Sequence, residues 1–242
     1  MPLYIATSQA VNGGPIYSLT TSDLLIVPSD VYLFQGSGSS TVYLLDRSRV
    51  HLSGQISALN GFGIFTGGTS SETEIIVNST GQITAPTAIA MNGYTASVRN
   101  DGLLISTPMP NTGSLFVIQL RATYNSLINT GRIIQDFPST QAVVFDSSNN
   151  IVENFGVITS RGGDVIAGSA LVVRNSGQLM VLSTGFSTAF AVRAVAGVLS
   201  LVNTGTIDTP AFLGGRQYDP AGAVFSGRVR RRSSIPARSS VI

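Results

Sequence analysis

One short motif recurs along the chain with nearly the same letters, as in "SLINTGRI" at 126–133, "VVRNSGQL" at 172–179 and "SLVNTGTI" at 200–207. Aligned on its glycine, the motif occurs seven times, at intervals of 27, 21, 29, 25, 21 and 28 residues. A constant bend with a variable spacer is typical of a solenoid, because the bends must superpose from coil to coil while the loops can differ. The seven glycines are Gly54, Gly81, Gly102, Gly131, Gly156, Gly177 and Gly205.

Two aliphatic positions flank each of these glycines, one four residues before it and one two residues after it. We expect the side chains at both positions to point inward from successive strands and to stack into continuous columns that form the core. All fourteen residues are aliphatic: Val50, Val77, Val98, Leu127, Val152, Val173 and Leu201 before the glycine, and Ile56, Ile83, Leu104, Ile133, Ile158, Leu179 and Ile207 after it.

Asparagine stands two residues before the glycine in five of the seven copies, and Leu52 and Ser79 take its place in the other two. Glycine adopts positive φ without steric cost and asparagine tolerates the left-handed region, so the pair predicts a corner of the backbone. If the corners stack at the strand spacing of about 4.8 Å, each carboxamide can donate a hydrogen bond to the next and form a ladder. The five asparagines are Asn100, Asn129, Asn154, Asn175 and Asn203.

A second kind of apolar segment lies between the corners, as in "TAIAMNG" at 87–93 and "QAVVFDS" at 141–147. Each repeat therefore holds two or three short strands, and the sequence predicts an all-β, right-handed parallel β-helix with coils of about 21–29 residues. We expect residues 1–49 to form the first coils, 50–227 the repeat body and 228–242 an arginine-rich tail. The longest apolar stretches are interrupted before the roughly 18 residues that a membrane span needs.

The Asn-(Ser/Thr)-Gly-x-Ile pattern resembles the β-helical regions of bacterial autotransporter passengers, filamentous adhesins and related large surface proteins. The resemblance covers residues 50–227, and "NTGRI", "NSGQL" and "NTGTI" carry it. It implies a parallel β-helix and an extracellular or cell-surface location, and it transfers no catalytic residue. No secretory signal is predicted from the opening "MPLYIATSQA", which lacks a positive region followed by an apolar one.

Few residues of this chain could carry chemistry. Cysteine and lysine are absent and His51 is the only histidine, which excludes thiolate chemistry, a multi-histidine metal site and a lysine-dependent phosphate loop. A strand through Glu72 and Glu74 would place both carboxylates on one face, either as a solvated surface or as a glycan or cation site. We predict a protein without catalytic residues, cofactor or metal. A carbohydrate-active enzyme would need convergent acids, for which Asp136, Asp164 and Asp208 are further candidates.

The last fifteen residues carry five arginines and no acid, whereas residues 1–227 hold nine arginines and twelve acids, a net −3. A solvated basic arm, a nucleic-acid or anionic-surface ligand and a tie to an acidic protein surface are the three interpretations. Nucleic acid is disfavoured because no aromatic residues are interleaved with the arginines. We favour a contact with a neighbouring subunit, and its candidate residues are Arg228, Arg230, Arg231, Arg232 and Arg238.

Solenoids normally shield their terminal coils with a polar cap, and none is recognisable in the sequence. The leading expectation is therefore a non-enzymatic structural protein that forms a homo-oligomer or filament by end-to-end stacking, outside the cell or on its surface. The alternatives are a monomeric adhesin module that binds a surface glycan, a polysaccharide lyase or hydrolase, and a phage or virus fibre.

Overall fold

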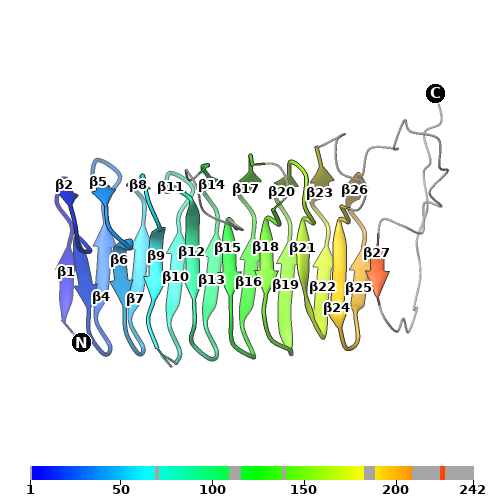
Figure 1. Ribbon diagram of the computed structural model, residues 1–242. Helices are drawn as coiled ribbons and strands as arrows, with labels where there is room; N and C mark the ends of the chain where they lie inside the picture. The colour runs from blue at the N-terminus through cyan, green and yellow to red at the C-terminus, as the bar shows by residue number, and fades with distance from the viewer. Residues whose placement is uncertain are drawn as a thin grey trace.

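Every regular element in the described part of the chain is a β-strand. The computed structural model describes residues 2–68, 71–108, 116–137, 140–182, 189–208 and, for the backbone alone, 224–226. Its strands form three parallel sheets of nine, and each sheet takes every third strand of the chain (Figure 1). This arrangement confirms the predicted right-handed parallel β-helix. Within the described residues there is no helix with the length and hydropathy of a membrane span.

The three sheets, named A, B and C in the order in which the chain enters them, run the length of the molecule. Sheet A holds β1 (Leu3–Ile5), β4 (Leu24–Val27), β7 (Arg49–Leu52), β10 (Glu74–Val77), β13 (Ser97–Asn100), β16 (Ser126–Asn129), β19 (Asn150–Asn154), β22 (Leu171–Asn175) and β25 (Ser200–Asn203). Sheet B holds β2 (Gln9–Asn12), β5 (Tyr32–Ser37), β8 (Gln55–Ala58), β11 (Gln82–Ala85), β14 (Leu103–Ser106), β17 (Arg132–Gln135), β20 (Val157–Ser160), β23 (Gln178–Val181) and β26 (Thr206–Asp208). Sheet C holds β3 (Tyr17–Leu19), β6 (Ser40–Leu44), β9 (Phe62–Thr66), β12 (Thr87–Met91), β15 (Ile118–Leu120), β18 (Val143–Phe145), β21 (Ile166–Ser169), β24 (Val192–Ala196) and β27 (Val224–Ser226).

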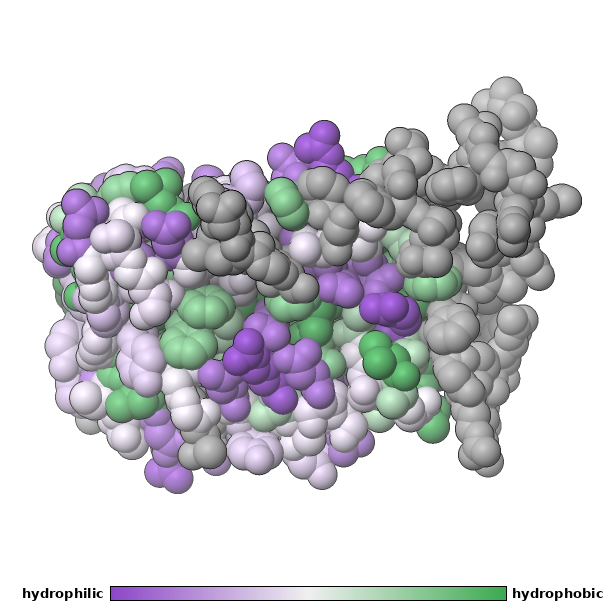
Figure 2. Space-filling model, in the orientation of Figure 1, coloured by the Kyte–Doolittle hydropathy of each residue, from purple (hydrophilic) through white to green (hydrophobic). Residues whose placement is uncertain are grey.

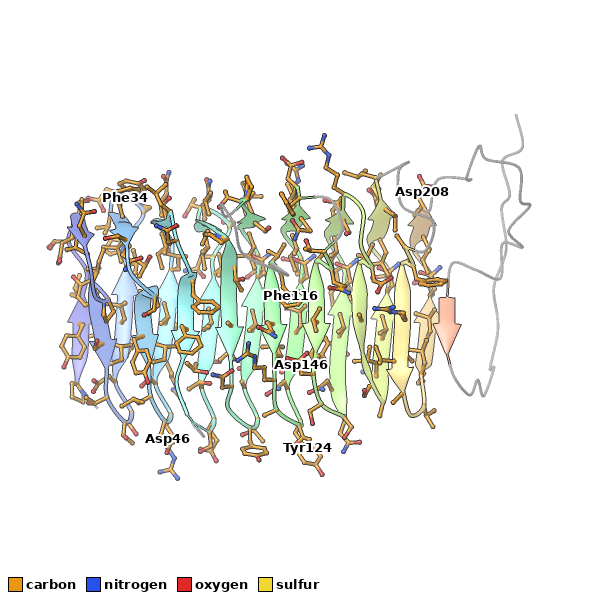
Figure 3. The ribbon with its side chains drawn as sticks, in the orientation of Figure 1. Phe34, Asp46, Phe116, Tyr124, Asp146 and Asp208 are labelled. Atoms are coloured by element: carbon orange, nitrogen blue, oxygen red, sulfur yellow. The ribbon has the colours of Figure 1, made fainter. Side chains whose placement is uncertain are left out.

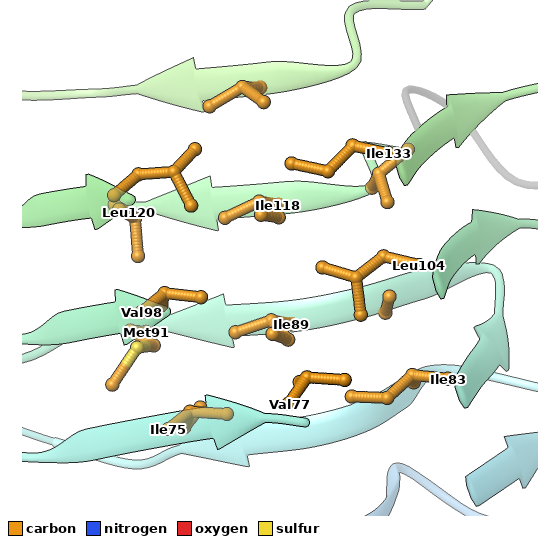
Figure 4. Packing of buried hydrophobic residues seen from close by; sticks show 14 of the residues in the cluster. Ile75, Val77, Ile83, Ile89, Met91, Val98, Leu104, Ile118, Leu120 and Ile133 are labelled. Carbon is orange, nitrogen blue, oxygen red and sulfur yellow. The ribbon is translucent and has the colours of Figure 1, made fainter. Parts of the chain in front are cut away.

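Residues from distant coils stack in register, as the repeat predicts. The column after the bend runs from Ile56 to Ile207 through all seven predicted positions. Figure 4 shows part of the core, where Leu104 lies between Ile83 and Ile133 in this column. Strands β1 to β6 belong to the same three sheets, so the first coils continue into the repeat body without a break.

One of the fourteen predicted column positions is wrong. Ile75, rather than Val77, lies between Val50 and Val98 in the aliphatic column of sheet A. The bend after β10 runs from residue 78 to residue 81 and is two residues longer than the bend at 101–102, so counting back from Gly81 reaches the wrong residue. Val77 instead occupies the column in which later coils carry asparagine.

The seven repeated positions require glycine for a different reason from the positive φ that we predicted. None of the seven has positive φ. A Cβ on Gly156 would lie 2.1 Å from the carbonyl oxygen of Gly131, and one on Gly131 would lie 2.2 Å from that of Gly102. Contacts this short are sterically forbidden, so glycine is required because successive bends lie directly on one another.

A left-handed residue recurs instead at the turn that leads from sheet C to sheet A. Each of eight successive turns has one shortly before the sheet A strand, and only the last of these eight is a glycine, although the third turn contains a second left-handed residue, Gly68. Figure 3 places Tyr124, one of this series, at the edge of the molecule where these turns lie. The eight residues are Ser22, Arg47, Glu72, Thr95, Tyr124, Asn149, Ala170 and Gly197.

Candidate functional site

The five asparagines form the predicted ladder. Asn100 Nδ2 donates to Asn129 Oδ1 at 2.7 Å, and Asn129 donates to Asn154 at the same distance. The series continues from Asn154 to Asn175 at 2.7 Å and from Asn175 to Asn203 at 2.6 Å. All the bonds point toward the C-terminus. The ladder therefore satisfies buried polar groups in the core and fixes the register of five coils.

The ladder begins abruptly in the middle of a column. The preceding members of this column are Val27, Leu52 and Val77, all fully buried. Because Val77 has no donor to offer, Asn100 Oδ1 is buried without a hydrogen-bond partner. The N-terminal end of the ladder thus carries one unsatisfied acceptor, a group that typically costs about 1–3 kcal/mol.

The N-terminal coil differs from the rest of the core and contains a cap that the sequence reading missed. Three of its inward positions hold Tyr4, Gln9 and Tyr17, where the next coil has Leu25, Leu33 and Val42. The hydroxyl of Tyr17 accepts hydrogen bonds from Gln9 Nε2 at 3.1 Å and from the Thr7 backbone N–H at 3.3 Å. Tyr17 also packs against the buried cluster, so its ring covers part of the core at this end.

The backbone edge of the same coil stays open among the described residues. Strands β1, β2 and β3 each end their sheet, so one side of each strand has no paired strand. On the outward side of β1, Leu3 is 56% exposed and Ile5 is 65% exposed. An edge of this kind is a template for pairing with another chain, and the two apolar side chains beside it add surface that another subunit could bury.

Glu72 and Glu74 form ion pairs with arginines of a neighbouring coil. Glu72 lies 3.4 Å from Arg47 and Glu74 lies 3.6 Å from Arg49, measured from carboxylate oxygen to Nε. Glu72 occupies a turn with φ +53° before β10, so the expected single strand through both glutamates is wrong. Exposed pairs of this kind stabilise by roughly 0–1 kcal/mol each.

The three candidate aspartates do not converge. The exposed Asp136 pairs with Arg161 at 3.0 Å, Asp164 is buried two residues before β21 of sheet C, and Asp208 ends β26 in sheet B. His51 is half-buried in β7, between Ile26 and Ile76 of neighbouring coils. No group of three or more metal-ligating side chains occurs in the described ranges.

Two aspartates have shifted pKa values for opposite reasons. Burial raises the pKa of Asp164, although the Phe190 backbone N–H donates to its Oδ1 at 2.9 Å and Arg193 Nε lies 2.7 Å from its Oδ2. The pKa of Asp46 is lowered by hydrogen bonds from the Ser71 hydroxyl and the Ser71 backbone N–H. Asp164 therefore anchors an arginine on sheet C, and Asp46 ties one turn to the next.

The outer face of sheet C is hollowed between β18, β21 and β24. A hollow of about 330 Å³ lies here, over the small residues Ala167, Gly168 and Ser169. Figure 3 shows Phe116 and Asp146, which both line it, in the middle of this face. This hollow could not be predicted from the sequence, because the residues around it come from separate coils. The other lining residues are Gln141, Val144, Phe145, Arg193 and Val195.

The expected assembly contacts of the tail, Arg228, Arg230, Arg231, Arg232 and Arg238, lie outside the described residues. No protein-family model, curated protein or solved structure matches the chain.

Proposed function

We propose that this protein is a non-enzymatic structural β-solenoid that assembles through its ends into a filament or surface assembly. The open edge of the N-terminal coil, with Leu3 and Ile5 exposed beside it, carries the proposal. An extracellular or cell-surface location is part of the same proposal and derives from the resemblance of the repeats to those of bacterial surface proteins.

The N-terminal cap refines how subunits would meet. Tyr17 packs against the core and accepts hydrogen bonds from Gln9 and Thr7, so a partner subunit would not meet a bare aliphatic column there. It would instead pair its backbone with β1, β2 or β3 and cover Leu3 and Ile5. A second copy of this chain fits such an edge, because each coil already stacks on the next by the same parallel pairing.

The surface chemistry supports a structural role. Several carboxylates are paired with an arginine of an adjacent coil, as in Glu153 with Arg174 at 2.6 Å. Such pairs join neighbouring coils along the outside of the solenoid. Glycoside hydrolysis needs two carboxyl groups that face one bond, whereas Asp146 is the only carboxylate among the residues that line the sheet C hollow. We therefore prefer the structural role to a lyase or hydrolase.

Sedimentation velocity and electron microscopy over a range of protein concentrations test the assembly. The wild-type chain is expected to form larger species as concentration rises, and Ile5→Lys to suppress them because a charge at the edge opposes association. Ile128→Lys is the matched control, since Ile128 is 37% exposed and lies in the same outward column of sheet A at mid-length. Wild-type protein that stays as dispersed short rods at high concentration would refute the proposal.

A further inference from the structure

The outer face of sheet C carries a row of side chains that begins with two aromatic residues. The row contains Tyr43, Phe65, Ala90, Gln119 and Val144 in successive coils and continues through Ala167 to Arg193. In Figure 2 this face shows hydrophobic and hydrophilic residues side by side along the coils. One step of the row is one strand spacing, about 4.8 Å, so the row forms a track parallel to the solenoid axis. Ala90 and Gln119 in the middle of this track are buried, whereas Tyr43 and Phe65 on one side of them and Val144 on the other are partly exposed.

Aromatic rings form a platform near one end of this track. Phe62 and Phe65 stack with ring centroids 4.7 Å apart and an interplanar angle of 19°, and the Tyr43 ring lies 5.9 Å from that of Phe65. All three side chains are half-buried, which leaves part of each ring to solvent. Flat, partly exposed rings held by their neighbours offer an apolar surface with little conformational entropy to lose on binding.

The hollow near the other end combines an apolar floor with polar groups of both kinds. Val144 and Ala167 form the apolar part, with Val195 beside them. Arg193 supplies N–H donors, and the buried carboxylate of Asp164 holds its guanidinium in place. Asp146 supplies an acceptor and is itself fixed by Gln119 Nε2, which donates to its Oδ2 at 2.9 Å. The side chain of Ser169 adds a hydroxyl to the lining.

The charges around the hollow are balanced, which favours a neutral ligand over an anionic one. Arg193 is paired with Asp164, and Arg121 lies 3.7 Å from Asp146, so no net positive charge is available to select an anion. Fixed donors and acceptors around an apolar floor suit a ligand that has hydroxyl groups on its rim and C–H groups on its face. Linear chains of neutral sugars have this chemistry.

We propose that the outer face of sheet C binds a neutral linear oligosaccharide, with one sugar unit in the hollow over Ala167 and the chain directed toward the rings of Phe62 and Phe65. This binding would be a property of the side of the solenoid and does not depend on assembly through its ends. Hydroxyl groups of the bound unit would donate to Asp146 and accept from Arg193.

Isothermal titration calorimetry with the full chain tests this site, with maltohexaose, cellohexaose and xylohexaose as neutral probes and hexagalacturonate as the anionic one. At least one neutral hexasaccharide is expected to bind, and more tightly than the corresponding disaccharide. Ala167→Leu fills the hollow and should weaken that binding at least about tenfold. Asp146→Asn replaces an acceptor-only group by one that also donates, and we expect it to weaken binding by about the same factor.

Ser126→Leu is the matched control, because it places the same leucine side chain at an outward position of sheet A, away from sheet C. Circular dichroism and thermal melting of every variant show whether the fold is kept. Failure of all neutral hexasaccharides to bind, or unchanged affinity in a folded Ala167→Leu variant, overturns the proposal. Binding of hexagalacturonate alone, strengthened by Asp146→Asn, would also overturn it and would indicate an anion site.

Discussion

Breaking the asparagine ladder in the middle should cost far more than shortening it at its first member. Valine is a fair replacement at either place, because Val27 and Val77 already occupy the same column. In Asn100→Val the unsatisfied acceptor Asn100 Oδ1 disappears, but Asn129 Oδ1 loses its donor and takes over that role. The number of unsatisfied side-chain acceptors therefore stays at one.

Asn154→Val leaves more buried polar groups without their ladder partner than Asn100→Val does. Asn100 Oδ1 remains unsatisfied, Asn175 Oδ1 loses its only donor in the ladder, and Asn129 Nδ2 loses its 2.7 Å acceptor. Two more buried groups are thus impaired than in Asn100→Val, at about 1–3 kcal/mol each. Asn129 Nδ2 keeps longer contacts with the carbonyls of Gly131 at 3.3 Å and Val157 at 3.4 Å, which favours the lower part of the range. We expect Asn154→Val to be less stable than Asn100→Val by about 2–4 kcal/mol.

Urea denaturation followed by far-ultraviolet circular dichroism measures this difference, with the wild-type chain as the common reference. The apolar gain of an added valine and the lost contacts with nearby carbonyls are similar at the two positions and cancel in the comparison. Equal losses of unfolding free energy in the two variants would refute the reasoning, because position in the ladder would then have no energetic meaning.

Two further predictions concern the corners and the turns. Gly156→Ala should destabilise the fold by about 3 kcal/mol or more, because the added Cβ would lie 2.1 Å from the Gly131 carbonyl oxygen. Ala170→Gly should stabilise the fold by about 1 kcal/mol, because Ala170 has φ +46° and glycine adopts this conformation without steric cost. Both changes are measured by urea denaturation, and a stabilised Gly156→Ala or a destabilised Ala170→Gly would contradict the assignment of roles to the two corners. Because the pKa of Asp46 is lowered in the native state, its carboxylate stabilises the fold at pH values above the ordinary pKa of 3.8. This contribution is lost as the pH falls through the lower pKa of the native state. The deficit of Asp46→Asn relative to wild type should therefore shrink in denaturation curves below pH 3.8, and a deficit that grows there would contradict the sign.

The repeat predicted the fold well because its physical cause is local and periodic. An aliphatic residue such as Leu127 recurs at a fixed distance from a glycine, and the pairing of Val98, Leu127 and Val152 follows from that distance. The interpretation of the glycine was wrong because two different constraints, positive φ and close approach, select the same residue. Only the three-dimensional stacking of bends distinguishes them.

The left-handed turn, the N-terminal cap and the sheet C hollow could not be predicted from the sequence, because no residue type marks them. The left-handed turn is occupied by residues as different as Arg47 and Tyr124, so no letter repeats at that place. The cap depends on Tyr17 reaching across its coil to Thr7, which becomes visible only when the register puts Tyr17 at an inward position. The sheet C hollow depends on small residues of one coil lying between larger ones of its neighbours.

The uniform direction of the ladder has a consequence for how such a chain can change its length. A coil copied in frame between Asn129 and Asn154 would receive one hydrogen bond from the coil before it and give one to the coil after it. The copied segment would add no unsatisfied acceptor to the ladder, because the only one there stays at Asn100. Duplication of a coil thus costs the ladder no hydrogen bond, and the ladder can lengthen by repetition without redesign of its two ends.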